Sequence, residues 1–230
     1  MKNSNVHADR FGQVWQHFQN GFRPLAYDPE RVAGFDDRKT SLTLSIPISQ
    51  TEIIHKIREI SAKLQGLDGI SLMPEEYYHV TVKWLGFFTD RKEKAYDIEA
   101  DTLDLIIEQA ESVIREVPSF KICLKRLNGL GSFVVCEVND NGAIARLQGR
   151  FHQDATDIPI YPLEGEEWLP HLSLASIKSQ KSISQLQHRI RQFRNVELGT
   201  VRVNEIHLSR AILQQPFPTC TTIHTFQLAN

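Results

Sequence analysis

The fold follows from two short apolar segments, His79-Val80-Thr81-Val82-Lys83-Trp84-Leu85-Gly86 and Pro170-His171-Leu172-Ser173-Leu174-Ala175. Each segment carries a histidine and a hydroxyl residue at positions i and i+2. Because side chains alternate between the two faces of a strand, this spacing places the imidazole and the hydroxyl on one face. Both segments are therefore predicted to be strands that present a histidine and a hydroxyl side by side.

Two such strands facing each other would equip a cleft with two imidazoles, His79 and His171, and two hydroxyl donors, Thr81 and Ser173. An imidazole can take up or release a proton near neutral pH, and a hydroxyl can donate a hydrogen bond to a phosphoryl oxygen. The predicted chemistry is acid–base catalysis on a phosphate ester. A single H-x-[ST] motif is weak evidence of function, but two in matched sequence contexts are informative.

The pair of motifs resembles that of the 2H phosphoesterases, a family marked by two H-x-[T/S]-x motifs about half a domain apart. Its members include 2′-5′ RNA ligase-like proteins and cyclic nucleotide phosphodiesterases. The first segment is similar to the family form H-x-T-x-R-F-L-G, with Lys83 and Trp84 at the Arg and Phe positions. The second keeps a proline before His171, but has Ser173 in place of Thr and Ser176 where many relatives carry Arg.

The pattern of apolar residues predicts an α+β chain. Alternation of apolar and polar residues predicts strands, and apolar residues at i, i+3 and i+4 predict helices. The expected elements are a strand over 42–46, a helix over 53–64, the first motif strand over about 79–88, a helix over 103–117, strands over 120–127 and 132–138 joined by an Asn128-Gly129 turn, a helix over 144–151, the second motif strand, a helix over 183–193, and closing strands over 201–213 and 221–228.

This order divides a domain of residues 41–230 into a first half of about 41–127 and a second half of about 132–228, with one motif in each. We interpret the halves as a diverged internal duplication. The resemblance, which extends over about 41–228, implies a two-lobed fold. In such a fold, antiparallel or mixed sheets face each other across the active cleft and the helices lie outside.

Residues 1–40 stand apart from this pattern as an N-terminal extension. Phe11, Trp15 and Phe18 recur at helical spacing, so a short amphipathic helix is expected, followed by an irregular arm. We interpret the extension as packed on the main domain. The alternative is a flap beside the cleft.

Composition narrows the classes of protein. The 230 residues include 26 Lys and Arg against 28 Asp and Glu, a balance that does not suggest a protein coating long nucleic acid. Three cysteines without a C-x-x-C pair favour a reducing compartment over structural disulfides. There is no apolar run of the roughly 20 residues that span a bilayer, and no signal-peptide core. The sequence therefore favours a soluble, cytoplasmic monomer without a membrane partner.

Further residues are candidate substrate contacts. Lys83 has the strand parity of His79 and Thr81, so it is predicted to point into the cleft and offset phosphate charge; a solvated lysine is the alternative. Tyr161 and Trp168 precede the second motif, where an aromatic ring can stack on a base.

Three other residues bear on the same cleft. Trp84 has the opposite parity to Lys83 and is expected in the core. Arg210 ends an apolar run where relatives carry Arg or Ser, which makes it a candidate phosphate contact. His207 begins a third H-x-S, but it breaks the register of the duplication, so we interpret it as structural.

No metal or cofactor is predicted, because the sequence has no H-x-x-x-H or Cys/His ligand spacing, no Gly-rich phosphate loop and no G-x-S-x-G elbow. The resemblance implies a metal-independent phosphoesterase that opens 2′,3′-cyclic phosphates at an RNA 3′ end or on a small nucleotide. One alternative is an enzyme that cleaves or joins 2′-5′ oligonucleotide linkages with the same residues. The other is a module that binds a nucleotide such as AMP without turnover.

Overall fold

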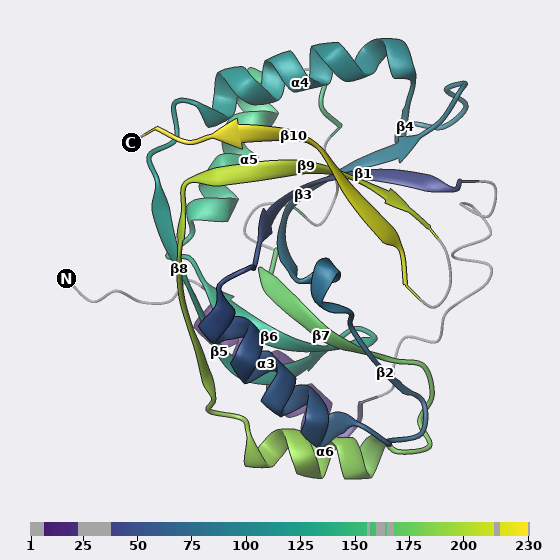
Figure 1. The fold of residues 1–230 in the computed structure, drawn as a ribbon, viewed down its shortest axis with the longest axis vertical. Coiled ribbons are helices and arrows are strands. Elements are labelled where there is room, and N and C mark those ends of the chain that lie inside the picture. The colour runs from purple at the N-terminus through teal and green to yellow at the C-terminus, as the bar shows by residue number, and fades with distance from the viewer. Residues whose placement is uncertain are drawn as a thin grey trace.

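The computed structural model describes residues 7–22, 38–155, 157–159, 164, 168–213 and 217–229. The sheet curls into two lobes, and helices lie on the outside of both (Figure 1). In chain order the elements are α1 (Ala8–Asn20), β1 (Thr40–Pro47), α3 (Thr51–Leu64), β2 (Ile70–Leu72), η1 (Glu75–Tyr77), β3 (His79–Phe88), β4 (Asp97–Ile98), α4 (Ala100–Ile114), β5 (Phe120–Leu130), β6 (Phe133–Asn139), α5 (Ala143–Asp154), β7 (His171–Ile177), α6 (Ile183–Gln192), β8 (Glu197–Val203), β9 (Glu205–Ile212) and β10 (Thr219–Gln227).

Neighbouring strands follow the order β10-β9-β1-β3-β7-β6-β5-β8, and the pairs along this path are antiparallel. The two motif strands, β3 and β7, lie at its centre. Within the described residues they are joined by one paired position, Val80 with Leu172. The first lobe is therefore β10, β9, β1 and β3, and the second is β7, β6, β5 and β8. The predicted two-lobed α+β class is confirmed.

The lobes are not built from the two consecutive halves of the chain. β9 and β10, near the C-terminus, pair with β1 in the first lobe, and β5 lies in the second lobe. The helices also cross over. α3 packs on β8 and α6 of the second lobe, whereas α5 packs on β3 and on α4 of the first (Figure 1). Each half of the chain thus buries its apolar surface against the other.

Two local predictions are wrong. β5 runs through the predicted Asn128-Gly129 turn to Leu130, and the hairpin turns at Gly131, whose φ of 59° suits a residue without a Cβ. The strand expected over 201–213 is two strands, β8 and β9, separated at Asn204. None of the described helices has the length and apolar character needed to cross a membrane.

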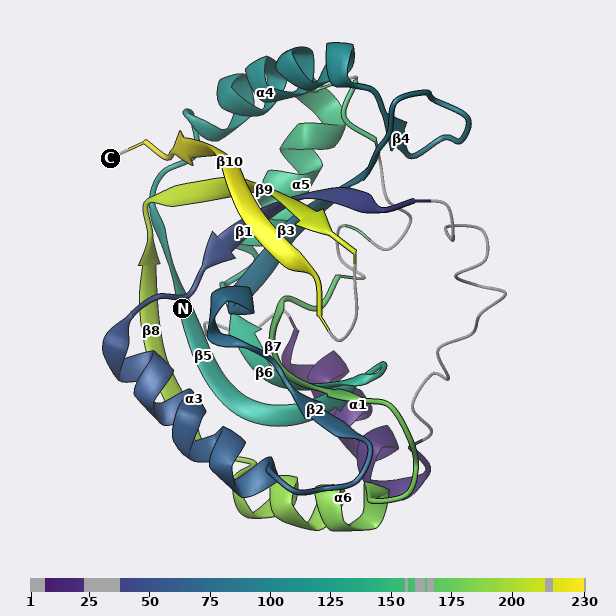
Figure 2. The same ribbon diagram turned by 45° about the vertical axis from the view of Figure 1, so that its right-hand side comes forward.

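The N-terminal helix α1 packs on the second lobe, beside β5 and α6 (Figure 2). The buried ring of Phe18 lies against Gly129 of β5, where a Cβ would come within 2.0 Å of it. Gln187 of α6 donates a hydrogen bond to the main-chain oxygen of Phe18. Residues 7–22 therefore pack on the main domain. The rest of the predicted arm, 23–37, lies outside the described residues.

Candidate active site

An irregularity in β3 decides which side chains of the first motif face the cleft. Val82 is an extra residue in the pairing with β1, because Thr81 and Lys83 lie opposite consecutive residues of that strand. Such a β-bulge resets the alternation of side chains. Val82 and Lys83 are therefore both buried, and Trp84, not Lys83, takes the face of Thr81.

The prediction that Lys83 points into the cleft is wrong. Its Nζ lies 2.6 Å from Glu164 Oε2, and the side chains are 0% and 2% exposed. His152 Nε2 lies 2.8 Å from the same oxygen. Burial lowers the pKa of Lys83, and the hydrogen bond and charge of Glu164 oppose that shift. Lys83 thus anchors a segment that precedes the second motif in the chain.

A cleft of about 680 Å³ lies between the lobes, a volume typical of small-ligand sites. Residues from β1, β3, β9 and β10 line it on one side, and the tip of the β5–β6 hairpin and the start of β7 on the other. The two motif histidines, His79 and His171, both line it. So does Trp84, which we expected in the core.

The two histidines have the same local geometry. His79 Nδ1 lies 2.8 Å from the main-chain oxygen of Tyr77, and His171 Nδ1 lies 2.7 Å from that of Leu169. A carbonyl oxygen only accepts, so both Nδ1 atoms carry the hydrogen. Each ring therefore keeps Nε2 for the cleft: as a proton acceptor when the ring is neutral and as a donor when it is charged.

Burial lowers the pKa of both imidazoles, because it disfavours their charged forms. The hydrogen bonds from Nδ1 to the main chain oppose this shift in each ring, and the charge of His171 lowers the pKa of His79 further. Both rings thus tend to be neutral at neutral pH. They are poised as proton acceptors until a bound anion stabilises a charged ring.

The motif hydroxyls differ in position. Thr81 lines the cleft, and none of the described residues forms a hydrogen bond with its hydroxyl. Ser173 lies on the same face of β7 as His171 and is half-buried, but it is not among the cleft-lining residues. The first motif is therefore the more open to a ligand.

Aromatic rings flank the histidines. Trp168 lines the cleft, with its ring centroid 6.3 Å from that of His171. Tyr77 packs against His79 at 4.9 Å, and burial raises its pKa to about 12, so its hydroxyl stays protonated. Tyr161, the other predicted aromatic contact, lies outside the described residues.

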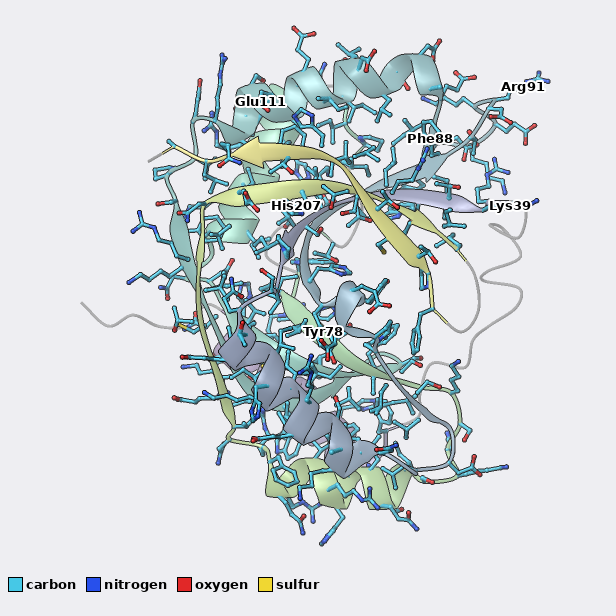
Figure 3. All side chains as sticks on the ribbon, viewed as in Figure 1. Lys39, Tyr78, Phe88, Arg91, Glu111 and His207 are labelled. Carbon is cyan, nitrogen blue, oxygen red and sulfur yellow. The ribbon has the colours of Figure 1, made fainter. Side chains whose placement is uncertain are left out.

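β9 contributes residues that sequence reasoning did not assign to the site. Its alternation places His207 and Ser209 in the cleft wall, whereas Arg210 is exposed on the opposite face. The prediction that Arg210 contacts a phosphate is wrong. His207, interpreted as structural, lines the cleft on the side of β9 that faces the second lobe (Figure 3). The sequence did contain a signal for this position, because His207-Leu208-Ser209 has the same i, i+2 spacing as the two motifs.

The charge of the cleft is low. Of the described residues that line it, none is Lys or Arg, and Glu76 is the one carboxylate. Among the described lining residues, the groups that could meet an anion are therefore imidazoles and hydroxyl dipoles, and not permanent cations. Across the described part of the chain, no three His, Cys, Asp or Glu side chains gather as metal ligands would.

Known proteins share this sequence pattern. Residues 47–212 match the 2′-5′ RNA ligase superfamily. The RNA 2′,3′-cyclic phosphodiesterase of Aeropyrum pernix is 28% identical over 165 residues, which cover 68% of this chain and 85% of the relative. The protein of the same name from Methanothermobacter thermautotrophicus is 23% identical over 181 residues, with 75% and 90% covered.

Solved structures share the fold. TT0787 of Thermus thermophilus superposes with a TM-score of 0.61 at 16% identity, covering 81% of this chain and 97% of that one. LigT of E. coli in its apo form gives 0.59 at 16% identity, with 84% and 99% covered. The two-lobed architecture is thus the common feature, and α1 precedes the residues that match the family.

Proposed function

Because the chain belongs to the 2′-5′ RNA ligase superfamily, as its two 2H-type motifs led us to expect, we propose that it opens 2′,3′-cyclic phosphates at an RNA 3′ end or on a small nucleotide. One observation carries the proposal: two histidines with matching main-chain hydrogen bonds line one cleft and keep Nε2 for a ligand. The activity named for the archaeal relatives supports it.

The proposed reaction uses the two imidazoles in opposite protonation states. One neutral ring accepts a proton at Nε2 from the attacking water, whose oxygen bonds to phosphorus. The other, protonated at Nε2, gives its proton to the ribose oxygen as the bond from that oxygen to phosphorus breaks. Thr81 and Ser173 donate hydrogen bonds to the non-bridging oxygens, where negative charge develops. His79 and His171 are each able to take either role.

The substrate itself supplies the missing charge state in this mechanism. Both histidines have pKa values below their usual range. A cyclic phosphate carries a negative charge, which raises the pKa of a neighbouring imidazole. Binding therefore favours protonation of one ring, and repulsion between two charged rings keeps the other neutral. We propose that no metal ion is needed, and that the protein acts as a cytoplasmic monomer.

The test is a product assay with 2′,3′-cyclic nucleotides and a short RNA that ends in a cyclic phosphate, with and without EDTA. We expect His79→Ala and His171→Ala each to lower kcat by roughly 100- to 10,000-fold, the range for a lost acid or base. The matched control is His55→Ala, since His55 is exposed on α3, away from the cleft. The rate should be bell-shaped between about pH 5 and 8, with its acidic limb below the usual histidine pKa of about 6.5.

Other outcomes would favour the alternatives. An undiminished kcat in either histidine variant, or a flat pH profile, contradicts two-histidine catalysis. Loss of activity in EDTA contradicts metal independence. Cleavage of 2′-5′ linkages but not of cyclic phosphates would favour the oligonucleotide enzyme. Saturable nucleotide binding without product would favour a binding module.

A further inference from the structure

We propose that the cleft contains a second subsite, which holds the nucleotide that precedes the reacting end, so that the ligand is an oligonucleotide end and not a mononucleotide. The inference rests on the proposed function for the identity of the reacting group. We call the residues concerned the polar row: Thr43 and Ser45 of β1, and His207 and Ser209 of β9. None of them belongs to the two motifs, yet all four line the cleft.

The pairing of three strands places the polar row beside the proposed catalytic residues. Thr81 of β3 lies opposite Ser45, and Ser45 lies opposite His207. Thr43 lies opposite Ser209 in the same way. Neighbouring strands are roughly 4.8 Å apart, so the main chain of His207 lies roughly 10 Å from that of Thr81, two strand spacings away. A nucleotide that adjoins a phosphate held at Thr81 is therefore within reach of the polar row.

The hydroxyls of the polar row have no partner within the described part of the protein. Neither Thr43, Ser45 nor Ser209 forms a side-chain hydrogen bond there. Ser45 is only 5% exposed, although it lines the cleft. Hydroxyls at the cleft wall that have no partner in the described part of the protein are open to a ligand rich in acceptors. Ribose and phosphodiester oxygens are such acceptors.

His207 is held in place at the end of the row. Its Nε2 lies 2.9 Å from Glu205 Oε1, and its Nδ1 lies 3.3 Å from Thr222 Oγ1. Glu205 and Thr222 thus hold the two ring nitrogens, and the ring and the Thr222 hydroxyl together form a polar part of the cleft wall. Thr222 lies opposite Ser209, so the polar surface continues onto β10.

The absence of Lys and Arg from the described cleft lining limits the ligand to a short end. Long nucleic acids are held mainly by cationic contacts along the phosphate backbone. A cleft lined by hydroxyls and imidazoles binds through a few directed hydrogen bonds instead. We therefore expect affinity to rise from one nucleotide to two and to change little with a third.

The test measures binding of unreactive, product-like ligands by calorimetry: adenosine 2′-phosphate, and ApA and ApApA with a terminal 2′-phosphate. We expect ApA to bind at least tenfold tighter than the mononucleotide, which is about 1.4 kcal/mol, and ApApA to bind within twofold of ApA. Ser209→Ala and His207→Ala should each reduce that ratio at least threefold. Thr221→Ala is the matched control, because Thr221 is an exposed neighbour of Thr222 outside the cleft lining and should keep the ratio.

Equal affinity for one and two nucleotides in the unmodified protein would overturn the subsite. A preference for ApA that survives both substitutions would also overturn it. The same length series with terminal 2′,3′-cyclic phosphates, followed by kcat/KM, separates the two proposals. Tighter binding of ApA without any turnover would support the subsite and contradict the phosphoesterase.

Discussion

Lys83 gives the sharpest test of the structure, because the sequence pattern and the fold assign it opposite roles. In a regular strand it would face the cleft and raise the affinity for phosphate. In the structure it is buried behind β3 and paired with Glu164 at 2.6 Å. Replacing Lys83 with methionine keeps an unbranched apolar stem of similar length and removes the ammonium group, with its charge and its hydrogen bond to Glu164.

The expected loss of stability follows from burial. With the side chains 0% and 2% exposed, the substitution leaves the Glu164 carboxylate almost without water. Its Oε1 already has no hydrogen-bond partner among the described residues, and Oε2 would keep only His152. Breaking a buried pair by removing one partner costs about 3–5 kcal/mol. For a chain of this size that corresponds to a fall in Tm of about 6–20 °C.

The measurement is urea unfolding, followed by tryptophan fluorescence and by circular dichroism to test two-state behaviour. The double variant Lys83→Met/Glu164→Leu removes both charges, so it should recover at least about 2 kcal/mol of the loss. Arg58→Met is the matched control. Arg58 pairs with Glu75, but their side chains are 63% and 43% exposed, so water replaces the lost contact.

Unfolding of Lys83→Met at the same urea concentration as the unmodified protein would contradict a buried, stabilising pair with Glu164. A raised KM for a cyclic nucleotide with no change in stability would mean that Lys83 reaches the cleft, and that the bulge at Val82 does not reset the strand.

Three further predictions concern stability. The pKa values of His79 and His171 lie below the usual value of about 6.5, so the unfolded state takes up protons first as the pH falls. The free energy of unfolding, measured with urea, should therefore decline from pH 7 to 5. The decline should be smaller in the double variant His79→Gln/His171→Gln. Gly86→Ala should cost at least about 1–3 kcal/mol, because Gly86 has φ of 140° and its Cβ would lie 2.2 Å from the Tyr96 oxygen; urea unfolding checks this. Phe18→Ala should cost about 3–5 kcal/mol and raise proteolysis of the N-terminal helix, which intact Phe18 protects; unchanged stability would mean that α1 is not docked.

The parts of the fold that depend on local periodicity were predictable from the sequence. Alternation identifies β1 and β3, and the spacing of Ile53, Ile57 and Ile60 identifies α3, whose buried face they form. The positions of His79 and His171 on one cleft followed from the same alternation, because each stands at the start of its strand, before any irregularity. Local pattern was thus sufficient to place both motif histidines.

The partner of each element was not predictable in this way. An apolar stripe on α3 or α5 shows that the helix is buried on one face, but not which sheet it covers. Both helices cross to the opposite lobe, and β9 pairs with β1 from the other end of the chain. The error about Arg210 and the neglect of His207 have this origin. Their roles depend on which face of β9 meets the cleft, and that face is set by pairing with a strand more than 150 residues earlier.

The bulge at Val82 has the largest consequence for the chemistry, and no residue type in the motif announces it. By turning Lys83 away and Trp84 inward, it removes a permanent charge from the cleft and adds an aromatic ring. Of the described groups in the cleft, the imidazoles are then the ones that can meet a phosphate with positive charge, and burial lowers the pKa of the two motif histidines. Anion binding and proton uptake are therefore linked. A lysine in the cleft would bind phosphate at any pH below its own pKa, whereas this cleft should bind it more tightly as the pH falls toward the histidine pKa values. The bulge that buries Lys83 thus leaves the proposed acid–base pair to gain its positive charge when the substrate binds.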